Sequence, residues 1–382
     1  MQETTRFNIH KFMQLIEKAE LNAIIAMSPQ NVYYTSGYIS LEPAYIPCAT
    51  LLFPQEAPVL ITPISDYGST FSCKDLWIDD HRFYGQYYME NLNPEIHSRY
   101  PTLFEAIHNV LQERKCVKGT VGFEGSYVSV DMFDKLCKNL PDAKLKTASS
   151  VFEEARMIKT SEEVNRLTQT LRLTERILLK TLNEVHVGMT ELEVAQILKR
   201  AVAEHNSELA FLEMGAGPRS GYVNNRATEN RLSQGDILRI DYGIIYDGYA
   251  SDISRNIVMG EPTTQMRKIH DAILSGQQKA ISAVRAGVKV SELFRVGVKE
   301  VREAGFPQFW RPNIGHGIGI EPHETPRICP DEKRDLQEGM VINIEMPYYI
   351  VGLGGFNIED TILVLEDGGK VLSETEHDLY SL

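Results

Sequence analysis

The sequence predicts a two-domain protein of the mixed α/β (α+β) class, an α/β domain followed by a strand-rich domain. Its 382 residues exceed the roughly 150 residues typical of one domain. Helical patterns and short apolar runs alternate over the first part of the chain, and strand-like runs dominate from Phe211 onward. The pattern changes around Arg156, so we predict domains covering residues 1–155 and 156–382.

The first domain shows alternating helix and strand signals. Residues 7–20 carry apolar side chains at helical spacing, and the apolar run at 23–27 indicates a strand. Further strands are predicted at 49–53, 59–61 and 120–123, with a helix at 103–111. This order predicts an α/β domain with a largely interior sheet.

Two helix starts mark the beginning of the second domain. Thr160 and Glu163 have the spacing of a capping box, and a second helix is predicted to begin near Thr190. A pair of helices is predicted between Met266 and Ala304 from its 3.6-residue periodicity.

A hairpin is predicted at Asp247-Gly248, between two apolar runs. A type I′ turn needs positive φ at both central residues, which Asp-Gly tolerates. With these two residues as the loop, Tyr246 pairs with Tyr249. Side chains alternate along a strand, so Asp241 and Asp252 then lie on one face as diagonal neighbours.

These two carboxylates have two interpretations. Either both lie on a solvated face, as most Asp residues do, or both are buried and need a cation to offset their charge. The isoleucine-rich run from Ile237 to Ile245 indicates an interior strand and favours burial. Burial of both carboxylates would require a metal ion with further ligands elsewhere in the chain.

Three candidates follow in the chain. His316 lies between glycines, and the runs ending at Glu345 and Glu359 each resemble a strand with an acid at its end. Gly352-Leu-Gly-Gly355 separates these strands, and the even separation of the acids places both on one face of a second hairpin.

Four carboxylates and one imidazole carry more negative charge than one divalent ion neutralises, so the pattern predicts two adjacent ions. Such ligands suit manganese, iron, cobalt or zinc, and the sequence does not choose among them. A lone His or Glu is more often structural or surface-exposed, and only the joint pattern predicts a site.

Composition and charge narrow the class of protein. The net charge of −13 disfavours nucleic acid or an anionic membrane surface as partner. Five scattered cysteines lack a C-x-x-C pair and fit a reducing compartment. The N-terminus lacks the apolar core of a signal peptide, and no run approaches the roughly 18 apolar residues of a membrane span. We expect a cytoplasmic enzyme.

The motifs resemble those of the pita-bread metallopeptidases, which include methionine aminopeptidase, aminopeptidase P and prolidase, together with the metal-free creatinase. The matching segments are Gly235-Asp-Ile-Leu-Arg-Ile-Asp241, Gly248-Tyr-Ala-Ser-Asp252, Gly315-His316-Gly-Ile-Gly-Ile-Glu-Pro-His323-Glu, Ile344-Glu345-Met-Pro and Ile358-Glu359-Asp-Thr. Asn31-Val-Tyr-Tyr-Thr-Ser-Gly37-Tyr is similar to the N-terminal signature of the prolidase and creatinase branch. The resemblance covers nearly the whole chain and implies a creatinase-like N-terminal domain before a pita-bread catalytic domain.

The resemblance also implies roles for the matching residues. Asp241 would hold one metal, His316 and Glu345 the other, and Asp252 and Glu359 would bridge both. A hydroxide between the metals would attack a carbonyl, and Glu345 would shuttle the proton. His323 would bind the substrate and stabilise the tetrahedral oxyanion, or pack beside the site as an ordinary loop histidine.

Two positions depart from the family pattern. Asn224 stands where peptidase members carry a substrate-contacting histidine, and Asn357 stands where many prolidase-like members carry an arginine. An amide donates a hydrogen bond but carries neither a proton nor a positive charge. We expect both residues to line the substrate site.

Three functions follow from the resemblance. The first is a metal-dependent Xaa-Pro dipeptidase or aminopeptidase acting on a peptide or amide carbonyl. The second, motivated by Asn224 and Asn357, is a non-peptidase hydrolase or lyase of a small polar metabolite, of the creatinase, ectoine hydrolase or dimethylsulfoniopropionate lyase kind. A binding protein without activity is the least favoured. The creatinase branch usually dimerises, so we expect a homodimer in which Tyr33, Tyr34 and Tyr38 line the neighbouring pocket or form plain core.

Overall fold

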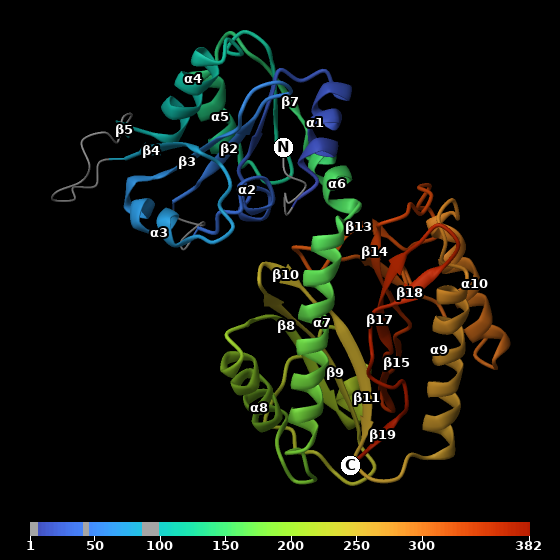
Figure 1. Ribbon diagram of the computed structural model, residues 1–382. Coiled ribbons are helices and arrows are strands. Elements are labelled where there is room, and N and C mark those ends of the chain that lie inside the picture. The colour runs from blue at the N-terminus through green and yellow to red at the C-terminus, as the bar shows by residue number, and fades with distance from the viewer. Residues whose placement is uncertain (1–6, 41–45, 86–98) are drawn as a thin grey trace. The chain divides into compact units, whose positions relative to one another are not determined.

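The computed structural model describes residues 7–40, 46–85 and 99–382, and the chain divides into two compact units, Met1–Arg156 and Met157–Leu382 (Figure 1). The N-terminal residues 1–6, on which the expectation of no signal peptide partly depends, lie outside the described residues. Within the described ranges, no helix combines the length and apolar character that a membrane crossing requires.

A seven-stranded mixed sheet lies at the centre of the first unit, in the order β5-β4-β3-β2-β1-β6-β7. Its strands are β1 (Ala23–Ala26), β2 (Ala49–Leu52), β3 (Val59–Pro63), β4 (Asp80–Tyr84), β5 (Arg99–Tyr100), β6 (Thr120–Phe123) and β7 (Lys144–Thr147). The helices are α1 (Ile9–Lys18), α2 (Pro29–Ser36), α3 (Tyr67–Ser72), α4 (Leu103–Glu113), α5 (Val130–Asn139) and α6 (Ser149–Met157), with a 3₁₀ turn, η1 (Ile64–Asp66). The predicted helices and strands of this domain are confirmed, and its core lies between the sheet and α4.

The segment that carries the N-terminal signature forms the short helix α2, which periodicity alone does not predict. Ser28 caps its start and Gly37, at φ +75°, ends it. The buried Glu124 carboxylate accepts hydrogen bonds from the Ser28 hydroxyl at 2.6 Å and from the Ser28 backbone N–H at 2.8 Å. Its negative charge at a helix N-terminus stabilises the helix.

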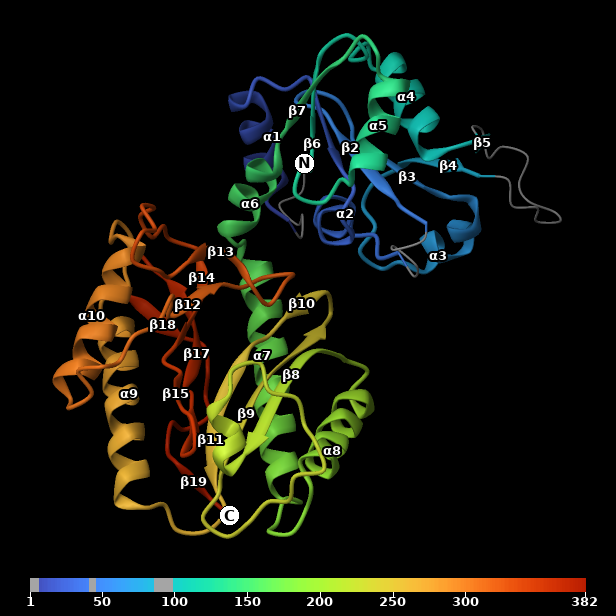
Figure 2. The same ribbon diagram turned by 180° about the vertical axis from the view of Figure 1, so that it is seen from behind.

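The second unit contains two main sheets, each covered by helices on its outer face (Figures 1 and 2). One sheet has the order β10-β9-β11-β19 with β8 paired to β9, and the other has the order β13-β12-β14-β17-β18. Their strands are β8 (Glu208–Ala216), β9 (Ile237–Tyr246), β10 (Tyr249–Ala250), β11 (Ile253–Val258), β12 (Gly315–Gly317), β13 (Glu324–Arg327), β14 (Val341–Glu345), β17 (Glu359–Val364), β18 (Gly369–Val371) and β19 (Tyr380–Ser381). A separate ribbon pairs β15 (Tyr348–Ile350) with β16 (Gly354–Phe356).

The covering helices are α7 (Ser161–Leu182), α8 (Glu191–Glu204), α9 (Thr264–Ser282) and α10 (Val290–Glu303), and η2 (Gly217–Gly221) follows β8. Figure 2 shows α7 and α8 beside the sheet that contains β9, and α9 and α10 beside the sheet that contains β14. Buried side chains of α9 and α10 pack on the second sheet to form the main core. The mixed α/β class predicted from the sequence is confirmed.

The predicted helix starts of this unit are confirmed in detail. Thr160 and Glu163 form a reciprocal capping box at α7, and Thr190 and Glu193 form another at α8. The helical pair predicted between Met266 and Ala304 is α9 and α10.

Candidate metal centre

The hairpin from β9 to β11 positions the first two carboxylates. Asp247 and Gly248 have φ of +50° and +78°, as a type I′ turn requires, and Tyr246 pairs with Tyr249 as predicted. Asp241 lies on β9 opposite Ser254, and Asp252 follows β10 where the hairpin continues into β11. Both carboxylates are buried, so the interpretation of a solvated face is wrong.

The second pair of carboxylates lies on β14 and β17. Glu345 is directly opposite Glu359 in the antiparallel register, which confirms that the two acids share a face. The predicted hairpin is more elaborate than expected, because β15 and β16 form a ribbon of their own between the two acids. Glu345 therefore ends one strand and Glu359 begins the next.

His316 is the imidazole of the site, at the centre of β12. A Cβ on Gly315 would lie 2.0 Å from the backbone oxygen of Asn343, so only glycine lets β12 approach β14 this closely. His316 Nδ1 lies 3.0 Å from the Gly317 carbonyl, which assigns the proton to Nδ1 and leaves Nε2 as a lone-pair donor. Nε2 lies 3.6 Å from Asp252 Oδ2 and 3.7 Å from Glu359 Oε1.

Asn343, on β14, joins the two hairpins. Its side-chain nitrogen donates to the Asp252 backbone oxygen at 3.0 Å and to Glu359 Oε1 at 2.9 Å. Its own oxygen accepts from the Thr361 hydroxyl at 2.8 Å. The sequence did not single out Asn343, and the polar residue in an otherwise apolar strand is the signal that was available.

Burial and mutual repulsion make these carboxylates hard to ionise without a cation. Burial raises the pKa of Asp241 to about 7, and burial together with neighbouring carboxylates raises the pKa of Asp252 and of Glu359 far above the usual range. Burial also raises the pKa of Glu345. Burial lowers the pKa of His316 to about 3, so its ring is neutral.

The donor set fits divalent metal ions. Ligand atoms of Asp241, Asp252 and Glu359 all lie within 4.8 Å of one another, as do those of Asp252, His316 and His323. Asp252 Oδ1 is buried, and no hydrogen-bond donor among the described residues contacts it. Cations at these two overlapping groups would neutralise the charge and supply the missing partner.

The predicted site residues line one cavity of about 540 Å³, with one exception. Those in its wall are Asn224, Asp241, Asp252, His316, His323, Glu345 and Glu359. His323 Nε2 lies 3.5 Å from Asp252 Oδ2, with its side chain 72% exposed, so it is free to meet a ligand. Asn224, at φ +49°, lies on an exposed loop of the same wall.

Asn357 is the exception. It is 0% exposed, and its side-chain nitrogen lies 3.3 Å from Asp241 Oδ2 and 3.5 Å from Glu345 Oε2. It thus contacts the carboxylates directly and lies outside the cavity lining. The substrate contact that we expected of Asn357 has no support in this geometry, and the contacts point to a residue that orients Asp241 and Glu345.

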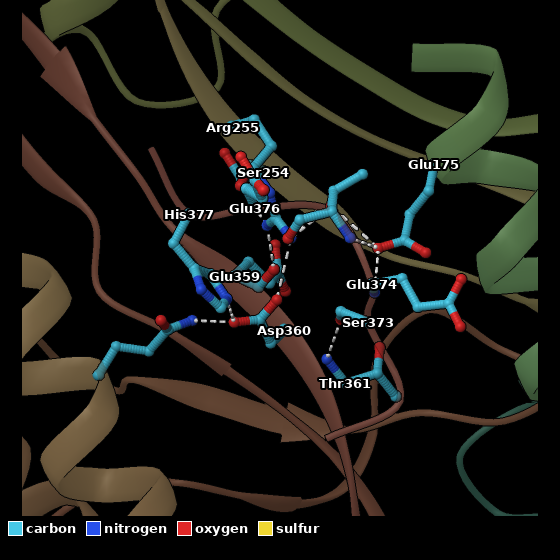
Figure 3. Close-up of polar contacts among 12 residues, drawn as sticks. Glu175, Ser254, Arg255, Glu359, Asp360, Thr361, Ser373, Glu374, Glu376 and His377 are labelled. Atoms are coloured by element: carbon cyan, nitrogen blue, oxygen red, sulfur yellow. Dashed lines mark hydrogen bonds and ion pairs between the residues drawn. The ribbon is translucent and has the colours of Figure 1, made fainter. Parts of the chain in front are cut away.

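A buried polar network lies behind Glu359 (Figure 3). Arg255 donates to the Glu359 backbone oxygen at 2.6 Å and to Asp360 Oδ1 at 3.0 Å, and His377 Nε2 lies 2.5 Å from Asp360 Oδ2. Burial alone would raise the pKa of Asp360, but Arg255 and His377 overcome it and hold that pKa below its usual value. The charged Asp360 thereby anchors the start of β17, and with it Glu359.

The same network ties the C-terminal segment to α7. Glu175 Oε1 accepts hydrogen bonds from the backbone N–H of Glu374 and of Thr375, both at 2.7 Å, and from the Thr375 hydroxyl at 2.9 Å. The hydroxyl oxygen of Thr375 in turn accepts a hydrogen bond from Arg255 at 2.7 Å. The start of β17 is therefore linked to α7 through Arg255, Thr375 and Glu175.

The cavity wall also contains residues that the sequence did not indicate, namely Glu213, Arg311 and Tyr349. Arg239 lies behind them, 3.7 Å from Asp241 Oδ2. Arg239 and Asp241 have the same parity on β9, so strand alternation was the signal that could have placed Arg239. Arg311 lies in an irregular segment before β12, where no periodicity indicates direction.

Comparisons with known proteins agree over the whole chain. Metallopeptidase family M24 matches residues 165–366, and the creatinase/prolidase N-terminal domain matches residues 8–158. The chain is 28% identical over 373 residues to an Xaa-Pro dipeptidase of Pyrococcus furiosus, covering 97% of this chain and 99% of that protein. The prolidase structure from Pyrococcus furiosus superposes with a TM-score of 0.80 at 28% identity, covering 95% of this chain and 99% of that one. An X-Pro aminopeptidase structure from Thermotoga maritima superposes with a TM-score of 0.82 at 25% identity, covering 97% and 100%.

Proposed function

The chain belongs to metallopeptidase family M24, and from that membership we propose that it is an Xaa-Pro dipeptidase with two divalent metal ions. The predicted resemblance, fold class and metal-dependent hydrolase activity are confirmed by the family matches and the similar peptidases. The non-peptidase alternative is not favoured, because the similar proteins named above are dipeptidases and aminopeptidases.

One observation supports the proposal most strongly. Two hairpins that are distant in the chain, together with β12, bring four carboxylates and a neutral imidazole to a single cavity, and a buried oxygen of Asp252 has no donor among the described residues. Asp241, Asp252, His316, Glu345 and Glu359 are the residues that would hold the metal ions. When bound, the ions supply Lewis acidity that activates water and polarises the scissile carbonyl.

The protein's own groups then move the protons and bind the developing charge. Glu345 accepts the proton of the attacking water and delivers it to the leaving nitrogen as the C–N bond breaks. His323 donates a hydrogen bond from Nε2 to the carbonyl oxygen as it becomes an oxyanion. Asn343 and Asn357 hold the carboxylates in place by hydrogen bonds to Glu359, Asp241 and Glu345.

A dipeptide panel tests this function. Protein reconstituted with manganese, iron, cobalt or zinc is expected to release proline from Xaa-Pro dipeptides. Metal occupancy near two per chain without cleavage of any dipeptide would contradict the peptidase and favour a different substrate. Asn224→His, which restores an imidazole in the cavity wall, is expected to raise kcat/KM on the same panel, while the exposed Asn183→His serves as a matched control.

Three finer properties are part of the proposal. A carboxylate-rich ligand set favours a hard ion, and manganese is the ion that we propose. All five cysteines are free thiols, which supports a reducing compartment such as the cytoplasm. We propose a homodimer, for which size-exclusion chromatography with light scattering is the direct measurement.

A further inference from the structure

A buried ion pair lies next to His323 in the chain. Lys159 Nζ is 3.1 Å from Glu324 Oε2, and the two side chains are 1% and 4% exposed. Glu324 directly follows His323 and is the first residue of β13, and both partners of the pair belong to the second compact unit. Neither side chain is among the described residues that line the cavity. The pair can therefore act on the reaction only through its neighbours.

Burial of two charges is costly, and stability alone explains this pair poorly. Removing an ammonium and a carboxylate from water opposes folding, and an apolar pair of similar size often stabilises a protein as well or better. The pair of Lys289 and Asp335, at 2.6 Å with side chains 58% and 51% exposed, avoids that cost at the surface. A requirement for fixed geometry accounts for the buried pair of Lys159 and Glu324.

The Glu324 carboxylate closes the loop that carries His323. Its Oε1 accepts a hydrogen bond from the Glu321 backbone N–H at 3.3 Å. Gly319 packs against the same carboxylate, since a Cβ on Gly319 would lie 2.5 Å from Oε2. The Gly319 carbonyl in turn accepts from the Ala250 N–H, on β10, at 2.8 Å. The loop from Gly319 to Glu324 is therefore folded around one carboxylate.

Both partners of the ion pair are also fixed through their backbones. Glu324 is opposite Gly317 where β13 pairs with β12, the strand that carries the candidate ligand His316. The Lys159 backbone N–H donates to the Gly339 carbonyl, in the turn before β14, at 2.9 Å. Because both backbones are anchored in this way, the contact between the two side chains fixes the end of the loop at which His323 lies.

His323 is exposed, so the position of its ring depends on its backbone. The side chain is 72% exposed, its Nε2 lies 3.5 Å from Asp252 Oδ2, and its ring centroid is 4.0 Å from that of His316. A donor stabilises an oxyanion best when it is already in place before the reaction. Misplacement of such a group by about 1 Å lowers a rate by about 100-fold.

We propose that Lys159 and Glu324 are positioning residues that hold His323 where it meets the oxyanion, a role that rests on the proposed peptidase function. The Lys159 ammonium offsets the charge of the carboxylate around which the loop folds. Loss of either partner leaves the other charge buried without its partner, so the loop must move or admit water. His323 then misses the developing oxyanion while the candidate metal ligands keep their places.

A double-mutant cycle with His323 tests this role in the metal-loaded full-length enzyme. Lys159→Met is expected to lower kcat for alanyl-proline about 10- to 100-fold and to change KM by less than about threefold. In a His323→Ala background, where the donor is absent, the same substitution should lower kcat by less than about threefold. Lys159→Arg keeps the charge and should retain more activity than Lys159→Met.

A matched control and a second variant complete the cycle. Lys289→Met breaks the exposed ion pair at the start of α10 and should leave kcat unchanged. Glu324→Gln keeps an acceptor for the Glu321 N–H, takes the place of Lys159→Met if that variant does not fold, and is expected to show the same dependence on His323. An equal loss of kcat with and without His323, or a loss that follows metal content, would overturn the positioning role and leave the peptidase intact.

The ring signals of the histidines give a readout that does not require turnover. In zinc-loaded protein, the ring C–H resonance of His323, identified by its absence in His323→Ala, is expected to shift in Lys159→Met. The resonance of His108, in the first unit, should stay in place. An unchanged His323 resonance in the folded variant would overturn the positioning role whatever the enzyme cleaves. A shifted His323 resonance in a protein that cleaves no dipeptide would overturn the peptidase assignment and leave the positioning of His323 intact.

Discussion

Asp252 shows at the scale of a single residue why this site needs a cation. It is 2% exposed, one of its oxygens has no donor among the described residues, and Asp241 and Glu345 raise its pKa beyond the effect of burial. Buried like charges destabilise a fold unless a cation or a proton offsets them. The carboxylates are therefore unfavourable in the metal-free protein and favourable in the metal-loaded one.

Replacement of Asp252 should separate its contribution to metal binding from its unfavourable effect on the stability of the metal-free protein. Asp252→Asn is expected to bring metal content toward zero and to abolish hydrolysis. In protein treated with a chelator the same change should stabilise the fold, by on the order of 1 kcal/mol, because the metal-free fold no longer has to bury or protonate this carboxylate beside its acidic neighbours. Elemental analysis and thermal unfolding measure the two results.

The exposed Asp131→Asn, in the first unit, is the matched control and should alter neither metal content nor stability. Retention of both metals by Asp252→Asn would remove Asp252 from the ligand set.

At the scale of the element, the two capping boxes have the same residue types, Thr and Glu, but their glutamates differ in burial. Glu163 accepts from the Thr160 backbone N–H at 2.8 Å and from the Tyr249 hydroxyl at 3.2 Å, and it is buried under the β9–β10 hairpin. Glu193 accepts from the Thr190 backbone N–H at 2.7 Å and is exposed. Burial raises the pKa of Glu163 to about 7, whereas the hydrogen bonds from Thr190 lower the pKa of Glu193.

The contributions of Glu163 and Glu193 to the free energy of unfolding should therefore change with pH in opposite directions. Glu163 binds its proton more tightly in the folded state, so its contribution to stability falls as pH rises between about 4.5 and 7. Relative to wild type, Glu163→Gln should be more favourable at pH 8 than at pH 5, by roughly 1 to 3 kcal/mol. Urea unfolding at both pH values measures this difference.

Glu193→Gln is the matched comparison. The lowered pKa of Glu193 means that its charge stabilises the fold above its unfolded pKa and that this stabilisation is lost as pH falls. The variant should therefore be less stable than wild type at pH 7, with the difference shrinking in acid. The same pH trend for both variants would contradict the assigned burial of Glu163.

At the scale of the whole molecule, the candidate metal ligands all lie in the second of the two compact units. A ligand that binds only the folded state stabilises the part that holds it. Each unit contains one tryptophan, Trp77 in the first and Trp310 in the second, so each can be followed separately.

Chelation should therefore affect the two units unequally. Metal removal is expected to lower the unfolding midpoint reported by Trp310, in a Trp77→Phe background, by roughly 5 to 10 °C. The midpoint reported by Trp77, in a Trp310→Phe background, should change little. Equal shifts of both signals would indicate that the chain unfolds as one cooperative body.

Local patterns in the sequence predicted much of the scaffold and the candidate ligands. The Asp247-Gly248 turn, the register of Tyr246 with Tyr249, the capping box at Thr160 and the helix start near Thr190 depend on neighbouring residues, and the structure confirms them. The short helix α2 and the β15–β16 ribbon were missed, because eight or fewer residues show too little periodicity.

The sequence by itself predicted the candidate metal ligands and determined which strand faces they share, because turn geometry and the two-residue period of a strand are local properties. Only the tertiary structure decided what surrounds them. Asn343 joins the two hairpins, Asn357 lies beneath the carboxylates, and Arg311 enters the cavity beside Tyr349. These positions depend on the packing of segments far apart in the chain, to which no local period applies.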